Sequence, residues 1–449
     1  MALIVQKFGG TSVANTERLF NVADIVTKTA QAGNKVVVVV SAQGDTTDDF
    51  IEKAAEITDN PPAREMDVLL SAGEQISMSL LAMAIEKLGF RATSLTGWQA
   101  GIRTDLNYGM SRIRSVKPER IQSLLDRNRI VIVAGFQGIN SHDSITTLGR
   151  GGSDTTAVAI AAALHADLCQ IYTDVDGVYT ADPRVVPGAK KLDEITYDEM
   201  LELATLGAQV LHNRSVEMAK KYNIDLEVVS SLTRNPGTKV KEVTSVEKMI
   251  ISGVACDKDV ARVAVIGLPD EPGKAFRLFS LLAKSKINID IILQSIGRNG
   301  SKDISFTVAR NQLDETVRLL EENRDKLHCD SITYESDIAK VSIVGAGMAS
   351  NSGVAAKMFE ALSNAHINIR MISTSEIKIS VLINEEEAQR AVRAVHDKFF
   401  DCLFCIAKSG FPKTGSRIFS FRPAATARRA GTREEVCFFY CQRRRFVLY

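Results

Sequence analysis

Three glycine-containing stretches hold most of the residues that could take part in chemistry. They are KFGGTS (7–12), SAQGDTTD (41–48) and LGRGGSDTTAV (148–158). Each leads toward a segment of helical period, and glycine at such a turn lets the backbone approach an anion closely. The free N–H groups and partial positive charge of a helix N-terminus favour the same ligand. These turns therefore predict a bound anion such as phosphate.

Lys7 stands out because it ends the apolar run LIVQKF just before Gly9 and Gly10. No G-x-x-x-x-G-K-[ST] motif is present, which excludes a P-loop enzyme. Phosphoryl transfer requires cations and N–H donors around the moving phosphate more than it requires one particular loop. We interpret Lys7 as a phosphate-stabilising cation, with an ordinary surface lysine as the alternative.

A fourth stretch, TDVDGVYTADPR (173–184), combines three aspartates with a tyrosine and an arginine. Carboxylates can accept hydrogen bonds from ribose hydroxyls, an aromatic ring can cover a base, and arginine pairs well with phosphate. The combination suits a nucleotide, whereas a solvated acidic turn is the simpler interpretation.

The elements that must position these residues follow from the hydrophobic pattern. Apolar runs typical of strands (3–8, 35–41, 91–95, 129–136, 167–175) alternate with helical segments (15–32, 64–88, 118–127, 153–165). Continuous Val/Ile runs indicate strands buried on both faces, and the alternation indicates a parallel sheet between helices. We predict an α/β fold for residues 1–245, a three-layer αβα domain with a mainly parallel sheet. Its three glycine turns would meet at the carboxyl edge, where such folds bind ligands.

An internal repeat occupies the second half of the chain. Residues 273–289 align without gaps on residues 353–369, and seven of 17 positions are identical. A strand precedes each copy, and a strand pair and a second helix follow it, so we predict two ferredoxin-like (βαββαβ) modules at 260–335 and 338–400. The run 249–255 could add a strand to the second module. Pairing of the modules across a homo-oligomer, a dimer or tetramer, would cover their small sheets.

The composition limits the possible partners and location. Residues 401–449 contain ten basic and three acidic residues, so residues 1–400 carry a net charge of −6 within a total of +1. A mildly acidic body argues against nucleic-acid binding. No uninterrupted apolar run approaches the ~20 residues that span a bilayer, and the amino-terminal sequence lacks the features of a signal peptide. We expect a cytoplasmic protein without membrane contact.

The basic tail, 401–449, shows no usable periodicity, and we expect it to be disordered and dispensable for activity. Its two cysteine pairs begin at Cys402 and Cys437 and lack spaced histidines. This argues against a zinc site, and we predict no metal site built from protein side chains.

Four motifs occur in order before the repeat: KFGGTS, LLSAGEQIS, LGRGGSDTTAVA and TDVDGVYTADPR. Because of these motifs and the repeat that follows them, residues 1–400 resemble the aspartate kinase branch of the amino acid kinase family. Members of that branch carry two C-terminal ACT domains. The resemblance implies transfer of the γ-phosphoryl group of ATP, with Mg²⁺, to the side-chain carboxylate of L-aspartate. The product would be 4-phospho-L-aspartate, on the first step toward lysine, threonine and methionine.

The resemblance also assigns roles to residues. Lys7 and Asp154 are the expected catalytic residues; the aspartate nucleophile is already ionised at pH 7, so Asp154 would orient Lys7 or the cation rather than act as a base. The expected nucleotide-binding residues are Lys7, Phe8, Gly9, Gly10, Thr173, Asp174, Tyr179, Asp182 and Arg184. The expected substrate-binding residues are Ser41, Thr47, Glu74, Arg150, Gly151, Gly152, Ser153 and Asp154. Glu74 would face the substrate ammonium group and Arg150 a carboxylate.

The chain departs from the family at Gln209, where a lysine is common. The ACT resemblance implies feedback inhibition by lysine, threonine or both. The expected effector-binding residues are Asp270, Gly273, Asn288, Ile289, Asp290, Gln294, Asn368, Ile369 and Ser375. Met249 could also mark an internal start that yields a separate regulatory subunit.

Three other functions compete with this interpretation. The run VGAGMAS (344–350) imitates the opening of a dinucleotide fingerprint, but it lacks the third glycine and lies within the repeat. A kinase for glutamate or a nucleoside monophosphate would share the fold, although Arg150, Glu74 and the paired modules argue against it. A non-catalytic amino-acid sensor is disfavoured because Lys7 and Asp154 are both present.

Overall fold

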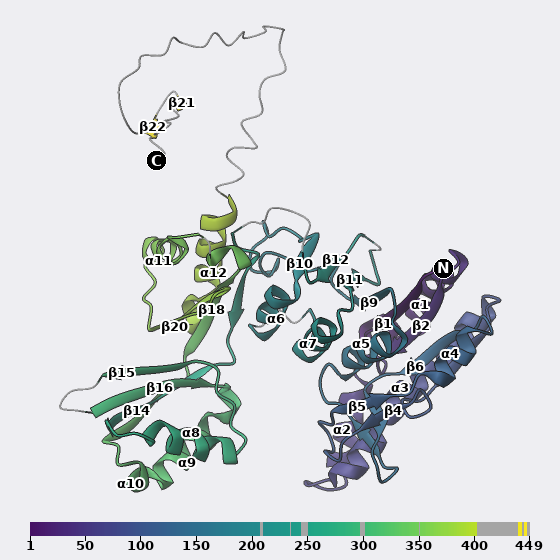
Figure 1. Ribbon diagram of the computed structural model, residues 1–449, viewed down its shortest axis with the longest axis horizontal. Helices are drawn as coiled ribbons and strands as arrows, with labels where there is room; N and C mark the ends of the chain where they lie inside the picture. The colour runs from purple at the N-terminus through teal and green to yellow at the C-terminus, as the bar shows by residue number, and fades with distance from the viewer. Residues whose placement is uncertain are drawn as a thin grey trace. The chain divides into compact units, whose positions relative to one another are not determined.

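The computed structural model describes residues 1–206, 210–233, 235–243, 250–296, 301–349, 351–401, 439–441 and 444–446. The chain divides into two units, Met1–Phe404 and Cys405–Tyr449. The first unit contains a large α/β domain and two smaller modules, which Figure 1 colours from purple through teal to green. Gln209 and Met249 lie outside the described residues.

An eight-stranded sheet forms the middle of the large domain. Its order is β10-β12-β11-β9-β1-β2-β6-β3, and neighbouring strands are parallel except for β11 and β12. The prediction of a mainly parallel sheet is confirmed. The strands are β1 (Leu3–Phe8), β2 (Lys35–Val40), β3 (Ala92–Leu95), β6 (Ile130–Ala134), β9 (Leu168–Thr173), β10 (Glu194–Thr196), β11 (Leu226–Ser230) and β12 (Thr238–Lys241).

Helices cover both faces of this sheet because successive valines of β2 point to opposite sides. Val36 and Val38 share a buried cluster with residues of α1 and α3, whereas Val37 and Val39 share another with residues of α4 to α7. The predicted three layers are therefore present. The helices are α1 (Thr16–Gln31), α3 (Ala63–Lys87), α4 (Glu119–Leu125), α5 (Gly152–Leu164), α6 (Tyr197–Thr205) and α7 (Asn213–Tyr222).

A second, four-stranded sheet was not predicted from the sequence. It has the order β5-β4-β7-β8, with β4 (Ile102–Thr104), β5 (Ile113–Val116), β7 (Gln137–Ile139) and β8 (Ile145–Thr147). Strands of three or four residues are too short for a clear period-2 pattern. The third glycine turn follows β8, so the expectation that it leaves a strand of the large parallel sheet was wrong.

The two modules have the same sheet layout but different chain paths. The first contains β14 (Ala261–Pro269), α8 (Lys274–Lys284), β15 (Ile292–Ile296), β16 (Ser301–Val308), α9 (Leu313–Glu322), α10 (Arg324–Leu327) and β17 (Ser331–Glu335), with sheet order β15-β16-β14-β17. The second contains β18 (Ile338–Val344), α11 (Val354–Asn364), β19 (Met371–Thr374), β20 (Lys378–Asn384) and α12 (Ala388–His396). Its fourth strand is β13 (Gly253–Asp257), which precedes the first module and pairs antiparallel with β18.

The glycines of VGAGMAS serve close packing in this second module. A β-carbon added to Gly345 would lie 2.4 Å from the Ile250 carbonyl oxygen, and one on Gly347 would lie 2.8 Å from the Ile250 Cα. The segment therefore gives room to the chain that leads into β13, and the dinucleotide alternative does not fit the fold in which it lies.

The remaining short elements are α2 (Thr46–Ala55), η1 (Gly10–Val13), η2 (Arg310–Gln312), η3 (Ala346–Ala349), η4 (Glu385–Glu387) and η5 (Asp397–Asp401). Within the described residues α3 alone has the length and composition to cross a bilayer. Its Met78, Leu81 and Ile85 lie in the core of the large domain, which is the position of a core helix.

In the second unit, β21 (Phe439–Cys441) pairs antiparallel with β22 (Arg444–Phe446). Disorder of the tail remains a prediction. The rest of the predicted tail, including Cys402 and Cys437, lies outside the described residues.

Candidate active site

The two predicted catalytic side chains form an ion pair. Lys7 lies on β1 and shares a face with Val5, which belongs to the cluster that includes α5 residues, because side chains two apart on a strand point the same way. Asp154 lies in the first turn of α5. Lys7 Nζ lies 2.6 Å from Asp154 Oδ1, and each side chain is 12% exposed. The fold thus fixes a cation and a carboxylate at the end of β1.

The turns after β1 and β2 interlock beside this pair. A β-carbon on Gly10 would lie 2.7 Å from the Ala42 carbonyl oxygen, so only glycine fits there. The Gly44 N–H donates to the Gly10 carbonyl at 3.2 Å, and the Ser41 N–H donates to Phe8 at 3.1 Å. A β-carbon on Gly9 would lie 3.5 Å from Lys7 Nζ. These contacts bring Gly9 close to the Lys7 ammonium group and Ser41 to the backbone of the next residue, Phe8.

Phe8 differs from its sequence assignment as a nucleotide contact. Its side chain is fully buried, and its ring stacks on Tyr172 at a centroid distance of 4.5 Å. Its place in the core leaves only backbone atoms for a ligand. Alternation along β1 explains the difference, since Lys7 and Phe8 point to opposite faces of the sheet.

The loop before α5 carries the predicted substrate residues Arg150 and Gly151, and the first turn of α5 carries Gly152, Ser153 and Asp154. Gly149 and Gly151 have left-handed φ values of 76° and 67°, which favour glycine. Arg150 between them is exposed. A β-carbon on Gly152 would lie 2.8 Å from the Phe136 ring, so α5 starts in close contact with the end of β6. The N–H groups of this helix start thereby lie at the sheet edge.

Glu74 is a buried acid of α3 with an incomplete set of partners. It is 4% exposed, and its Oε1 accepts the Ala42 N–H at 3.1 Å. Its Oε2 has no hydrogen-bond partner among the described residues. Burial raises the pKa of Glu74 to about 8. The Oε2 atom is therefore available to pair with a cationic group of a ligand. Thr47, half-buried at the start of α2, also belongs to the predicted substrate set.

The predicted nucleotide residues follow β9, next to β1. Thr173 Oγ1 donates to Asp174 Oδ1 at 2.9 Å, and Tyr179 donates to Asp176 at 2.7 Å. Arg184 forms a two-pronged pair with Asp182, at 2.9 Å between Nη2 and Oδ2, and this hydrogen bonding lowers the pKa of Asp182. The Gly9 N–H donates to the Tyr172 carbonyl at 3.3 Å. Thr173 is therefore adjacent to the glycine turn, whereas Arg184 is bound to its own loop.

The predicted effector residues lie on the surfaces of the two modules. Gly273 and Gly353 have φ values of 91° and 85° and precede α8 and α11. Asp270 pairs with Lys302 at 2.5 Å, and Asp290 pairs with Lys340 of the second module at 2.6 Å. Ser375 lines a hollow of about 420 Å³ beside Gly353. Asn288, Gln294 and Asn368 are exposed, and Ile289 and Ile369 are half-buried.

The sequence interpretation missed Asp67, about two turns before Glu74 on α3. Asp67 is 1% exposed; it accepts the Gly109 N–H at 3.0 Å and the Thr147 hydroxyl at 2.7 Å. Burial raises the pKa of Asp67, although these hydrogen bonds oppose the shift. Asp67 therefore connects α3 to β8, the strand that leads into the Arg150 loop. Little in the sequence distinguished it, because Asp67 is one of several acids in α3, along with Glu65, Glu74 and Glu86.

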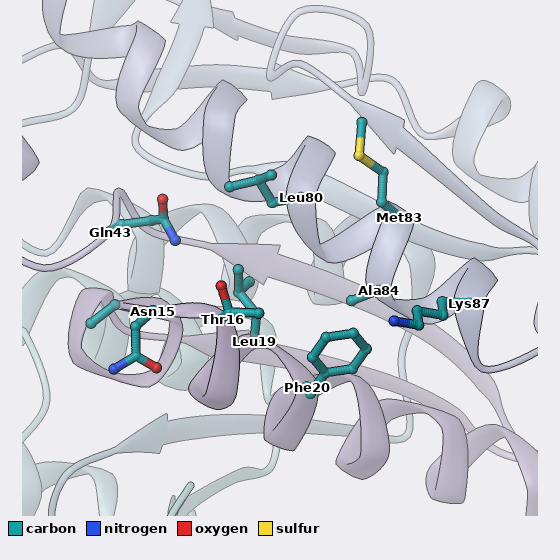
Figure 2. A pocket seen from close by; sticks show the side chains of 10 residues that line it. Asn15, Thr16, Leu19, Phe20, Gln43, Leu80, Met83, Ala84 and Lys87 are labelled. Carbon is teal, nitrogen blue, oxygen red and sulfur yellow. The ribbon is translucent and has the colours of Figure 1, made fainter.

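A separate hollow of about 390 Å³ lies between α1 and α3. Figure 2 shows Phe20 and Lys87 on one part of its wall and Gln43 on another. Lys87 Nζ lies 5.2 Å from the centre of the Phe20 ring, and Gln43 donates to the Val13 carbonyl at 2.7 Å. This hollow does not include Lys7 or Asp154. Among the described residues no group of three or more His, Cys, Asp or Glu side chains could hold a metal ion.

Comparison with known proteins agrees with the fold. A profile of the amino acid kinase family matches residues 2–230, and an ACT domain profile matches residues 263–323 and 341–399. The chain therefore belongs to the amino acid kinase family. A Bacillus sp. (strain MGA3) aspartokinase is 53% identical over 400 residues, which cover 89% of this chain and 97% of the relative. Within its family the chain belongs to the aspartokinases, and it is a kinase.

Two solved structures of E. coli aspartokinase III are similar to most of the chain. Each is 28% identical and covers 89% of this chain. The complex with aspartate and ADP, called the R-state, has a TM-score of 0.76 and is covered completely. The complex with lysine and aspartate, called the T-state, has a TM-score of 0.69 and is covered to 99%.

Proposed function

We propose that the chain transfers the γ-phosphoryl group of ATP to the side-chain carboxylate of L-aspartate, giving 4-phospho-L-aspartate and ADP. A carboxylate oxygen attacks the γ-phosphorus while the bond to the β,γ-bridging oxygen breaks. The nucleophile is ionised at pH 7 because its usual pKa is ~3.9, so no proton has to be removed. The observation that carries the proposal is the Lys7–Asp154 pair between the glycine turns.

Lys7 stabilises the negative charge on the phosphoryl group during its transfer, and Asp154 holds the ammonium group of Lys7 in place. A fixed cation at a poorly hydrated position stabilises a transition state without reorganisation at the moment of reaction. Gly9, Gly10 and the start of α5 supply N–H donors around the phosphates. Mg²⁺ would neutralise the β- and γ-phosphates, and in this proposal it arrives with the nucleotide.

Recognition of aspartate falls to Arg150, Glu74 and the hydroxyl groups of Ser41, Thr47 and Ser153. Arg150 can pair with a carboxylate through two parallel hydrogen bonds. Glu74 Oε2, without a hydrogen-bond partner among the described residues, would take the substrate ammonium. The nucleotide would contact the residues at and after the end of β9, namely Thr173, Asp174, Tyr179, Asp182 and Arg184. Arg184 would first have to leave its pair with Asp182 or share it with the nucleotide.

We also propose feedback inhibition by lysine, threonine or both through the ACT domains. Support comes from Glu199 of α6, a buried acid of the kinase domain that also forms hydrogen bonds with the second ACT module. Its Oε1 accepts the Ser252 hydroxyl at 2.7 Å and the Ala346 N–H at 2.9 Å, both beside the paired ends of β13 and β18 in the second module. Its Oε2 accepts the Thr196 hydroxyl at 2.6 Å, which caps α6. A shift of the module would thereby reach a helix of the kinase domain.

Assembly through the ACT domains is part of the proposal. The edge strands β15 and β19 expose Ile292, Leu293 and Ile372 by 53%, 39% and 41%. Open edges with apolar side chains favour pairing with a second copy. The proposal also retains the cytoplasmic location and the pathway toward lysine, threonine and methionine. A separate regulatory subunit would start near Met249, outside the described residues.

The deciding experiment traps the acyl phosphate with hydroxylamine. We expect hydroxamate to form with L-aspartate and MgATP, and to fall away with L-glutamate or without ATP. Addition of millimolar lysine and threonine, singly and together, tests the regulation. Absence of hydroxamate with intact, folded protein would favour the non-catalytic sensor instead.

A further inference from the structure

Arg214, at the start of α7, contacts the segment that leads into the Arg150 loop. Its Nη1 donates to the Leu148 carbonyl at 2.6 Å and its Nη2 to the Ser111 carbonyl at 3.0 Å. The planar guanidinium holds two acceptors in a fixed geometry, which an ammonium group does not. Leu148 is itself fully buried. Arg214 therefore fixes the point from which the loop departs.

His212 contacts the other end of the same loop. A β-carbon added to Gly151 would lie 2.2 Å from His212 Cγ, so the imidazole ring lies directly against the Gly151 backbone. His212 Nδ1 accepts the Arg214 N–H at 3.3 Å and caps α7. Burial lowers the pKa of His212, which agrees with a neutral ring that accepts at Nδ1.

The loop between these contacts has little rigidity of its own. Gly149 and Gly151, on either side of Arg150, both have left-handed φ values, and glycine is the residue with the greatest backbone freedom. Arg150 is exposed, so its own side chain is not held by the core. The direction in which Arg150 points depends on what grips the loop ends.

We propose that Arg214 and His212 are positioning residues that hold Arg150 in its substrate-binding geometry and thereby set the affinity for the amino-acid substrate. The inference rests on the proposed function, in which Arg150 binds a carboxylate of aspartate. It extends that function to α7, which the sequence motifs left without a role. Arg214 touches neither reactant; it acts through the loop.

The first test is Arg214→Lys, assayed at varied aspartate and varied ATP. We expect the KM for aspartate to rise about tenfold, a loss of about 1.4 kcal/mol, because lysine cannot hold both carbonyls. The KM for ATP and kcat should change by less than about threefold, since Lys7 and Asp154 are untouched. Lys221→Gln is the matched control: it removes an exposed cation from the same helix and should leave all three constants unchanged. Equal changes in both KM values would overturn the inference.

A double-mutant cycle separates positioning from general stability. Arg150→Ala alone should raise the KM for aspartate, and Arg214→Lys should then add little, because coupled residues are not additive. If the two effects add fully, Arg214 does not act through Arg150 and the inference is wrong. If Arg150→Ala itself leaves the KM for aspartate unchanged, the proposed role of Arg150 fails instead.

His212→Asn is the second variant, useful if Arg214→Lys melts at a much lower temperature. Asparagine still caps a helix well, but it removes the ring that lies against Gly151. We expect a rise in the KM for aspartate of about threefold, with the melting temperature retained. An unchanged KM for aspartate in this folded variant would remove His212 from the proposal.

Discussion

The proposed phosphate end and the proposed amino-acid end of the candidate site each contain a poorly exposed carboxylate, but the two groups have different partners. Asp154 lies 2.6 Å from the ammonium group of Lys7. Glu74 Oε1 accepts the Ala42 N–H at 3.1 Å, and its Oε2 has no hydrogen-bond partner among the described residues. The first carboxylate therefore has a counter-charge within the fold, whereas the second has none in the part of the chain that the structure describes. Burial raises the pKa of Glu74 to about 8.

The difference shows which end of the site is complete before a ligand binds. A buried charge without a counter-charge is costly, so such a group stays protonated until a cation arrives. Lys7 and Asp154 already lie in contact with each other, at 2.6 Å, without a ligand. Glu74 would ionise when a positive group binds beside it, and this agrees with a substrate ammonium group at the proposed amino-acid end.

Removal of Lys7 should produce the largest effect. We expect Lys7→Met to lower kcat by about 10³-fold, because one preorganised donor to a developing anion is worth that much. Hydroxamate formation measures it, and Lys28→Met, at an exposed pair on α1, is the matched control. A Lys7→Met enzyme with more than a tenth of the normal kcat would show that the phosphate end does not depend on this cation.

Asp154→Asn should lower kcat by about 10²-fold, since the ammonium group loses its orientation but remains present. The KM for aspartate should change less than kcat. The combined variant with Lys7→Met should be no worse than Lys7→Met alone, because the two residues act as a unit. Near-normal turnover of Asp154→Asn would contradict the positioning role.

Glu74→Gln tests the other end and should act on affinity. We expect the KM for aspartate to rise about tenfold, with the KM for ATP unchanged, because the amide is neutral. Below pH 8 the wild-type enzyme should release a proton from Glu74 when aspartate binds. Calorimetry in buffers of different ionisation enthalpy detects that proton, and Glu74→Gln should release none. Identical proton release in both proteins would assign it elsewhere.

Glu199→Gln tests the link between the ACT domains and the kinase domain. Burial pushes the pKa of Glu199 up, but hydrogen bonds from Thr196, Ala346 and Ser252 bring it below its usual value. An amide would place an N–H group against these donors. We expect the inhibitor concentration for half-inhibition to rise about fivefold while kcat changes little. Unaltered inhibition would exclude this carboxylate as the connection.

The smallest expected effect concerns stability. Glu74 has a raised pKa in the fold, about 8 against 4.5 when unfolded, so the unfolded state loses its proton first as pH rises. This group's contribution to stability is therefore present below pH 4.5 and is lost between about pH 4.5 and pH 8. Melting temperatures measured across that window should fall more in the wild type than in Glu74→Gln. Parallel curves would show that Glu74 is ionised throughout.

The sequence predicted most of what depends on local pattern. The valine run of β2, the helix limits of α1 and α3 and the repeated module all follow from periodicity and spacing. The short strands β4, β7 and β8 were not predicted, because each has only three residues. Phe8 was assigned to the nucleotide because it stands in the same motif as Lys7, Gly9 and Gly10. Alternation along β1, however, turns its side chain into the core.

Residue types and their order alone determined the class of fold, the family and the set of candidate groups, because glycine turns, buried strands and repeats leave local marks. Tertiary structure decided which groups meet. It paired Lys7 with Asp154, left Glu74 without a counter-charge among the described residues, and placed Arg214 on the Leu148 carbonyl. Such contacts join residues far apart in the chain, and their protonation depends on burial, which no local pattern reports.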